Sequence, residues 1–324
     1  MKCSLANPNI APHIRETLKS YEEHGFLDTF FTSYYFDSHS RLNRFVERYI
    51  PSVTKELRRR CIEAIPSERV RSRPLPEFLR VLSSRKFSCK ITDQIWEWGE
   101  LGFDRWVASR LDPTLDWVHT SEHAGLETLK RAKKLGIMSI HEQPSLHHQF
   151  FSQIIARQTA LYPAFDSGVT QLLYDENSVR RNRRRDAELS LADHILCNSQ
   201  FTKTTLVNGG VDEAKIITVP LGFPAVQERG ERASNDKIRF MYAGNIAFGK
   251  GIHLLLEAWR EIRSDLIELW LIGNVALPSS LLQDLPDNIR FIPRLPHSEL
   301  MNTYQSADVF IHPTLADGFG MVIA

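Results

Sequence analysis

The chain has 324 residues, 42% of them hydrophobic and 24% charged, a composition typical of globular proteins, and its length indicates two domains. The 40 basic and 39 acidic residues leave a net charge of +1, which argues against a polyanionic partner and predicts no binding of nucleic acid. Four scattered cysteines without metal or disulfide spacing, no signal peptide and no apolar run of ~20 residues predict a cytoplasmic protein that contacts membranes, if at all, through its surface.

The first two-thirds of the chain alternate between strand-like and helix-like segments. The predicted elements are, in order, strand 2–6, helix 11–23, strand 28–35, a mostly helical stretch 41–110, strand 117–119, helix 125–135, strand 137–141, a polar helical stretch 145–187, strand 192–198, helix 201–208 and strand 216–220. Gly25 and Gly136 are placed to end the helices that precede them. Alternation of this kind favours a parallel sheet covered on both faces.

A polar linker at 223–237 separates these elements from a second alternating series. That series comprises strand 238–244, helix 251–262, strand 268–272, a short helix 279–284, strand 289–292, helix 297–306 and strand 309–312. We therefore predict an α/β protein with an N-terminal domain at 1–222 and a C-terminal domain at 238–324. The second domain is shorter than the ~100–150 residues of a complete one, so we expect it to be incomplete and the chain alone to be inactive.

A glycine-rich segment, residues 244–251 (GNIAFGKG), follows a predicted strand and opens a helix. Ligands of open α/β sheets bind beyond the carboxyl ends of the strands, where free N–H groups and the helix dipole favour phosphate. Lys250 adds a mobile cation that suits a diphosphate. The alternative is an ordinary glycine-rich turn with a solvated lysine, since the segment is neither a P-loop nor a dinucleotide fingerprint.

A second motif, residues 317–320 (DGFG), follows the last predicted strand. Its glycines free the backbone at a strand-to-helix junction, and the Asp317 carboxylate could accept hydrogen bonds from sugar hydroxyls. The alternative is a helix N-cap, a position that aspartate favours in any protein. Because both motifs follow strands of one parallel sheet, we expect them to face the same cleft.

A histidine, His141, ends a predicted strand of the first domain and is followed by Glu142, Gln143 and Pro144. It could donate a hydrogen bond to a substrate hydroxyl or orient it, or it could be an ordinary loop histidine among the twelve in the chain. The neighbouring His147 and His148 lack the partners of a zinc site, so we expect no metal.

An arginine-rich run, residues 180–185 (RRNRRR), lies in the polar helical stretch. It could bind anionic lipid, a diphosphate or RNA, or it could be a solvated helix face. No aromatic interleaving accompanies the run, which weakens the nucleic-acid interpretation.

These motifs resemble those of GT-B glycosyltransferases, and in particular the large retaining group called family 4. Residues 192–199 (ADHILCNS) resemble the family's Ala-Asp…Ser stretch, and 219–222 (VPLG) resemble the end of its first domain. Residues 244–258 resemble its diphosphate loop and helix, and 317–320 resemble the start of its E-x7-E motif. The resemblance covers the whole chain, is strongest from 192 to 324, and implies two Rossmann-like, doubly wound domains facing a cleft.

The resemblance implies transfer of a sugar from a nucleoside diphosphate sugar to an acceptor hydroxyl with retention and without a metal or other cofactor. The acceptor could be a growing polysaccharide, a lipid-linked sugar or a small molecule, and the basic helical stretches are compatible with peripheral membrane contact. In the family pattern Lys250 contacts the diphosphate, and Asp317 contacts the sugar. The implied site comprises the catalytic residues His141, Lys250 and Asp317 and the donor-binding residues Gly244, Asn245, Lys250, Gly318, Phe319 and Gly320.

The chain departs from the family pattern in four places. Asn245 and Gly249 stand where the family usually has an arginine, and Asp317 replaces a longer glutamate. The second carboxylate of the motif would be position 325, beyond the sequence, and residues 7–9 (NPN) replace a pair of glycines. These departures favour the alternative of a non-catalytic or fragmentary GT-B protein that binds a sugar or partner without turnover. A nucleotide-sugar epimerase, a phosphorylase and a nucleic-acid-binding module are more distant alternatives.

Overall fold

A computed structural model describes residues 1–37, 60–86, 89–165, 175–223, 237–262 and 264–323, together with residues 40, 43 and 48. The chain divides into two compact units. The first comprises Met1–Pro144 and Tyr174–Leu221, and the second comprises Ser145–Leu173 and Gly222–Ala324. The sequence pattern instead predicts that all of 1–222 forms one domain.

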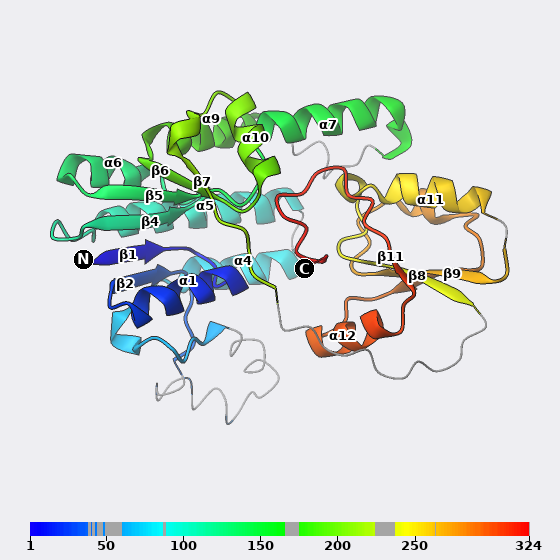
Figure 1. The fold of residues 1–324 in the computed structure, drawn as a ribbon, viewed down its shortest axis with the longest axis horizontal. Coiled ribbons are helices and arrows are strands. Elements are labelled where there is room, and N and C mark those ends of the chain that lie inside the picture. The colour runs from blue at the N-terminus through cyan, green and yellow to red at the C-terminus, as the bar shows by residue number, and fades with distance from the viewer. Residues whose placement is uncertain are drawn as a thin grey trace. The chain divides into compact units, whose positions relative to one another are not determined.

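The first unit contains a parallel sheet with the strand order β3-β2-β1-β4-β5-β6-β7 (Figure 1). Its strands are β1 (Cys3–Ala6), β2 (Leu27–Thr32), β3 (Val70–Ser72), β4 (Trp117–Ser121), β5 (Met138–Glu142), β6 (His194–Cys197) and β7 (Ile216–Thr218). The chain extends the sheet to one side of β1 and then to the other, so the order reverses between β1 and β4. This is the doubly wound arrangement that the alternating sequence predicts.

Helices cover both faces of the first sheet. They are α1 (Pro12–Glu23), α4 (Leu75–Lys86), α5 (Cys89–Ala108), α6 (Leu126–Leu135), α9 (Glu176–Leu191) and α10 (Gln200–Asn208), with 3-10 turns at Ser67–Arg69 and Glu213–Lys215. Ile14 and Leu18 of α1 pack with Leu5 and Phe30 on one face. On the other face, α5 packs against β1 and β2, and α6, α9 and α10 share a core with β6. Apolar side chains of both faces are thereby withdrawn from water.

The second unit is built on a parallel sheet with the order β10-β9-β8-β11. Its elements are α7 (His148–Leu161), a 3-10 turn at Pro163–Phe165, β8 (Ile238–Ala243), η5 (Phe248–Lys250), α11 (Ile252–Glu261), β9 (Ile267–Ile272), η6 (Ser279–Leu282), β10 (Ile289–Ile292), α12 (His297–Gln305) and β11 (Val309–Phe310). Figure 1 shows α11 and α12 on opposite faces of this sheet. Alternate residues of β8 supply the two cores: Tyr242 packs with α11, and Met241 packs on the α12 side.

Helix α7 groups with the second unit because its side chains pack against α11. Ile155 belongs to the same buried cluster as Tyr242 and Leu255. The Tyr162 hydroxyl donates to Glu257 Oε2 at 2.8 Å, and His253 Nε2 lies 3.2 Å from Gln158 Oε1. Sequence adjacency alone does not reveal such packing, which is why the sequence pattern assigns the segment to the first domain.

Most predicted elements are present with boundaries shifted by a few residues. The structure adds the short strand β3 inside the stretch predicted as mostly helical. Residues 41, 42, 44–47, 49–59, 87, 88, 166–174 and 224–236 of the predicted helices and linker lie outside the described residues. Gly136 ends α6 in a left-handed conformation with φ 73°, as its position predicts. Within the described ranges, no helix combines the length and the apolar character needed to cross a bilayer.

Two buried carboxylates cap the N-terminus of α6. Glu188 of α9 accepts hydrogen bonds from the backbone N–H groups of Gly125 and Leu126, both at 3.1 Å. Asp104 of α5 accepts from the backbone N–H groups of Glu127 at 2.7 Å and Thr128 at 2.9 Å. The free amides and the positive end of the helix dipole are therefore satisfied by the protein itself.

The arginine-rich run of α9 is largely engaged in ion pairs within the first unit. Arg184 contacts both Asp104 and Glu188, and Arg185 contacts Glu122. Arg181 pairs with Asp93 at 2.6 Å and Arg180 with Glu97 at 2.8 Å. The run is therefore neither a simply solvated face nor a free basic patch, because four of its five arginines face carboxylates of their own unit.

We predict that Arg184→Gln lowers the free energy of unfolding by about 3 kcal/mol, because it leaves the buried Asp104 and Glu188 without their cation. Arg183→Gln is the matched control, since Arg183 is exposed on the same helix and should change stability by less than ~0.5 kcal/mol. Urea denaturation followed by circular dichroism measures both. Equal effects of the two substitutions would contradict the structural role of Arg184.

Candidate functional site

The second sheet brings both predicted donor motifs to one place. From β8 the chain builds β9 and β10 on one side, and β11 then pairs with β8 on the other side. The carboxyl ends of β8 and β11 are therefore neighbours at the point where the strand order reverses. Such switch points are where open α/β sheets bind ligands. Residues 244–251 follow β8, and residues 311–320 follow β11.

Lys250 and Asp317 join the two motifs directly. Lys250 Nζ lies 2.6 Å from Asp317 Oδ2, and both side chains are about one-third exposed, at 36% and 31%. The other carboxylate oxygen, Oδ1, accepts a hydrogen bond from the Gly320 N–H at 3.3 Å. Burial alone would raise the pKa of Asp317, but the hydrogen bond and charge of Lys250, with the turn's amides, outweigh it and lower that pKa. Asp317 is thus a carboxylate anchored to the ammonium group of Lys250.

Glycine at 251 allows the two motifs to approach this closely. Its backbone has φ 68°, and a Cβ atom there would lie 2.0 Å from the carbonyl oxygen of Pro313. No side chain fits in that gap, so the backbones of the two segments touch only because Gly251 has none. Gly244 is also constrained, with φ 146° and the Tyr242 hydroxyl 2.8 Å from the position of a Cβ.

The remaining predicted donor-binding residues lie in the same two segments. The Asn245 side chain is exposed, and its backbone carbonyl accepts from the Tyr242 hydroxyl at 2.8 Å. Gly318 and Phe319 are half-buried in the turn that Asp317 caps, and Gly320 ends that turn with φ 74°. The sequence allows Asp317 to be a helix N-cap. The structure agrees in part, because Asp317 caps a turn rather than a helix.

Two further polar side chains of this region escape the sequence motifs. His312 Nδ1 and Thr314 Oγ1 are buried and have no hydrogen-bond partner among the described residues. Burial lowers the pKa of His312, with Asp317 opposing and Lys250 assisting, so the neutral ring is influenced by both charges. The sequence could have indicated both residues, since they lie just after the last strand, where parallel sheets place ligand-binding groups.

His141 occupies the carboxyl end of β5 in the first unit and is fully buried. Its Nδ1 and Thr120 Oγ1 share a hydrogen bond of 3.0 Å. Its Nε2 is buried, has no hydrogen-bond partner among the described residues and lies 3.8 Å from Glu188 Oε2. Burial lowers the pKa of His141 to about 3, which keeps the ring neutral. His141 belongs to a different unit from Lys250 and Asp317.

A second polar group surrounds Glu142, the residue after His141 on β5. Glu142 Oε1 is 3.4 Å from His13 Nε2 of α1, and Oε2 is 3.9 Å from His119 Nε2 of β4. Burial raises the pKa of Glu142 to about 7 and lowers that of His119 to about 4. The Tyr21 hydroxyl and His119 Nδ1 share a hydrogen bond of 3.1 Å. No sequence motif signals this group, because its members come from three separate elements.

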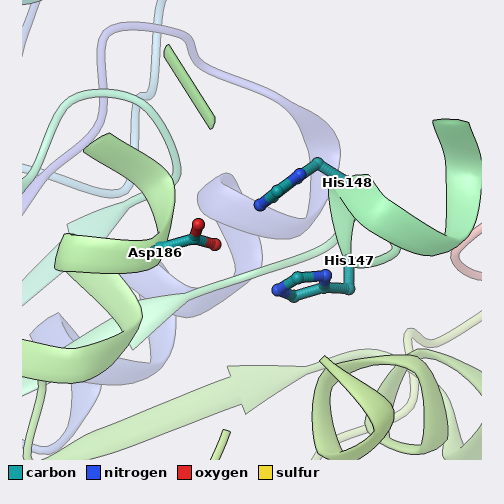
Figure 2. A group of neighbouring side chains, drawn as sticks. All are labelled: His147, His148 and Asp186. Atoms are coloured by element: carbon teal, nitrogen blue, oxygen red, sulfur yellow. The ribbon is translucent and has the colours of Figure 1, made fainter. Parts of the chain in front are cut away.

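The adjacent histidines His147 and His148 stand at the start of α7 in the second unit. Their rings stack with centroids 4.5 Å apart, and His147 Nδ1 accepts from the Gln149 N–H at 3.3 Å, which caps the helix. Figure 2 shows both rings, together with Asp186 of α9, a residue of the first unit. Within its own unit, His147 is therefore the N-cap of α7.

Two parallel, doubly wound α/β units are the architecture of the GT-B fold, and solved structures with that fold match this chain over nearly its whole length. Residues 226–324 match the family model described as "Glycosyl transferases group 1". The chain therefore has the GT-B fold, and its second unit contains a group 1 glycosyltransferase match. The predicted fold class is confirmed.

Curated relatives match less than half of the chain. The "D-inositol 3-phosphate glycosyltransferase" of Thermobifida fusca (strain YX) is 28% identical over 171 residues, and the match covers 44% of this chain and 39% of the relative. The protein with the same description from Kineococcus radiotolerans is 28% identical over 158 residues, and the match covers 40% of this chain and 36% of the relative. The matches thus span less than half the length of these two proteins.

Solved structures are similar across nearly the whole chain. Anabaena HepE in complex with UDP-glucose has a TM-score of 0.54 at 13% identity, and the match covers 100% of this chain and 77% of HepE. The trehalose-6-phosphate synthase OtsA has a TM-score of 0.54 at 10% identity, over 99% of this chain and 80% of OtsA. At such low identity these likenesses show the fold alone.

We predict that Gly251→Ala lowers the free energy of unfolding by at least about 2 kcal/mol, because alanine meets both the left-handed backbone and the Pro313 carbonyl. Gly249→Ala is the matched control, since its Cβ would meet only side-chain atoms at 3.6 Å or more. Chemical denaturation compares the two variants. A Gly251→Ala protein as stable as the control would show that the two segments are not in contact.

We predict that Glu142→Gln changes the pH dependence of stability. The folded-state pKa of about 7 lies above the ~4.3 of an unfolded glutamate, so the stability that this carboxyl contributes is fully present below pH ~4 and is lost as pH rises through 7. The unfolding free energy of Glu142→Gln relative to the unmodified protein should therefore rise by about 2 kcal/mol between pH ~5 and pH ~8. Urea titrations at several pH values measure it, with the exposed Glu16→Gln as control. A difference that stays constant with pH would refute the assignment.

Proposed function

We propose that the protein is a retaining glycosyltransferase of the family 4 type, which transfers a sugar from a nucleoside diphosphate sugar to an acceptor hydroxyl without a metal. The observation that carries this proposal is the ion pair of Lys250 and Asp317 at the switch point of the second sheet. That sheet lies in residues 226–324, which match the group 1 glycosyltransferase model. An ammonium group suits the diphosphate of such a donor, and a carboxylate suits its sugar hydroxyls.

The donor proposal begins with UDP-sugars. HepE, which shares this fold, is described in complex with UDP-glucose, and this supports UDP-glucose as the first donor to test. Lys250 and the backbone N–H groups that follow β8 would hold the diphosphate, with Gly244 and Asn245 in the same loop. Asp317 and the turn at 318–320 would hold the sugar.

In the proposed reaction, the bond between sugar C1 and the diphosphate oxygen breaks, a bond from C1 to the acceptor oxygen forms, and the proton of the acceptor hydroxyl passes to the departing diphosphate. The transition state resembles an oxocarbenium ion, as in glycoside hydrolysis. The diphosphate leaves with additional negative charge, which Lys250 and nearby amides would stabilise. This arrangement supports a reaction without a metal, since a cation and amides of the chain can meet that charge.

His141 would hydrogen-bond a hydroxyl of the donor or acceptor through Nε2, because Nδ1 is already engaged by Thr120. Burial lowers the pKa of His141 to about 3, so the ring is neutral at pH 7 and is neither a general acid nor an effective general base. Since His141 is fully buried, a substrate hydroxyl would reach Nε2 only after a local rearrangement. The acceptor itself could be a polysaccharide, a lipid-linked sugar or a small molecule.

A second candidate is a GT-B protein that binds a sugar nucleotide without turning it over. The specific observation in its favour is that Lys250 is already paired with Asp317, while Asn245 and Gly249 supply no second cation. Donor binding without release of nucleoside diphosphate in the presence of a broad acceptor panel would select this candidate.

We predict that Lys250→Ala lowers turnover of a UDP-sugar donor at least ~100-fold, because it removes the cation that stabilises the leaving diphosphate. The fold should survive, since Lys250 is one-third exposed and its ion pair is a surface contact. Release of UDP measures turnover, circular dichroism checks the fold, and Lys237→Ala serves as an exposed lysine control from the same unit. Unchanged turnover in a folded Lys250→Ala protein would refute the role of this lysine.

A further inference from the structure

We propose that Asp317 determines the preference of the site for a sugar-bearing donor over the sugar-free nucleoside diphosphate, by competing with the diphosphate for Lys250. This inference rests on the proposed function and adds a specificity role that the sugar contact alone does not include. It begins from the ion pair of 2.6 Å between Lys250 Nζ and Asp317 Oδ2.

The formal charges of the two segments that follow β8 and β11 cancel each other. Residues 244–251 and 312–323 contain one lysine, one aspartate and one histidine, His312, which burial keeps neutral. The lysine assigned to the diphosphate is therefore already neutralised by the carboxylate assigned to the sugar. A diphosphate must share Lys250 with Asp317 or displace it.

Both oxygens of Asp317 are engaged, and this makes the competition specific. Oδ2 faces Lys250, and Oδ1 accepts from the Gly320 N–H at 3.3 Å, which keeps the carboxylate beside the lysine. The pair is about one-third exposed, so opening it returns both charges to water at little cost. A ligand can therefore separate the pair without unfolding the segment.

A nucleoside diphosphate and a sugar-bearing donor differ in the groups that they place beside Asp317. A nucleoside diphosphate takes Lys250 and leaves an unpaired carboxylate beside its phosphates, where like charges repel. A sugar-bearing donor takes Lys250 as well, but its hydroxyls can donate hydrogen bonds to the released carboxylate. Asp317 therefore weakens binding of the sugar-free diphosphate and strengthens binding of the donor. After transfer, its return to Lys250 would favour departure of the product.

The test compares binding of UDP and UDP-glucose to the unmodified protein and to Asp317→Asn by isothermal titration calorimetry. Asparagine keeps the shape and can still accept from Gly320, but it no longer holds Lys250 as an anion. We expect UDP to bind about fivefold more tightly and UDP-glucose to bind more weakly, so that the preference for the donor disappears. Asp287→Asn, an exposed aspartate of the same unit, controls for the change in net charge and should shift neither affinity.

A second arm separates competition for Lys250 from general repulsion. In the Lys250→Ala background there is no cation to compete for, so Asp317→Asn should tighten UDP binding less than it does in the unmodified background. Equal tightening in both backgrounds would assign the effect to repulsion alone and overturn the inference. Unchanged or weaker UDP binding by Asp317→Asn would also overturn it.

Failure of the proposed function gives a different result. If the unmodified protein binds neither UDP nor UDP-glucose, nor the corresponding GDP and ADP compounds, then the nucleotide-sugar assignment fails and the inference fails with it. If the unmodified protein binds a donor and its diphosphate with no dependence of their ratio on Asp317, then only the inference fails.

Discussion

The position of β8 between β9 and β11 is the constraint on which the candidate site depends. Parallel strands end at the same edge of a sheet, so the segments that leave β8 and β11 must start side by side. Residues 67 positions apart can then form an ion pair, and the two backbones touch at Gly251. The sheet order thus converts two separate glycine-containing motifs into one arrangement of a cation, a carboxylate and a turn.

The two units use helix and strand ends in different ways. In the first unit, the N-terminus of α6 is filled by Asp104 and Glu188, whose side chains are fully buried and compensated by Arg184. Opening that network would leave charges in a poorly solvated interior, which costs several kcal/mol. In the second unit, Lys250 and Asp317 are about one-third exposed and can separate into water. The same chemical components are therefore structural in one unit and available to a ligand in the other.

Much of the fold could be predicted from the sequence, because alternating strand and helix patterns, glycine stops and strand-end motifs are local signals. The meeting of residues 244–251 with 317–320 also follows from the expectation of one parallel sheet. The grouping of α7 with the second unit does not, because it depends on Ile155 packing with Tyr242 and Leu255 across long sequence distances. For the same reason, the sequence does not show whether the arginines of α9 are solvated, bind an anion or pair within the protein. Their partners lie elsewhere in the sequence, at Asp93, Glu97, Asp104 and Glu122. Sequence patterns reveal which side chains are charged, whereas only tertiary structure reveals which charges are already matched.

An aspartate at position 317, rather than a glutamate, has a physical meaning in this geometry. A carboxylate on a short side chain stays close to its own backbone, so one oxygen can cap the Gly320 N–H while the other faces Lys250. A glutamate carboxylate would sit one methylene farther from the turn and would lose rotamer freedom to make the same two contacts. Aspartate therefore couples the turn, the carboxylate and the lysine more tightly than the longer residue would. This coupling would let a single side chain respond both to a sugar hydroxyl and to the charge on Lys250.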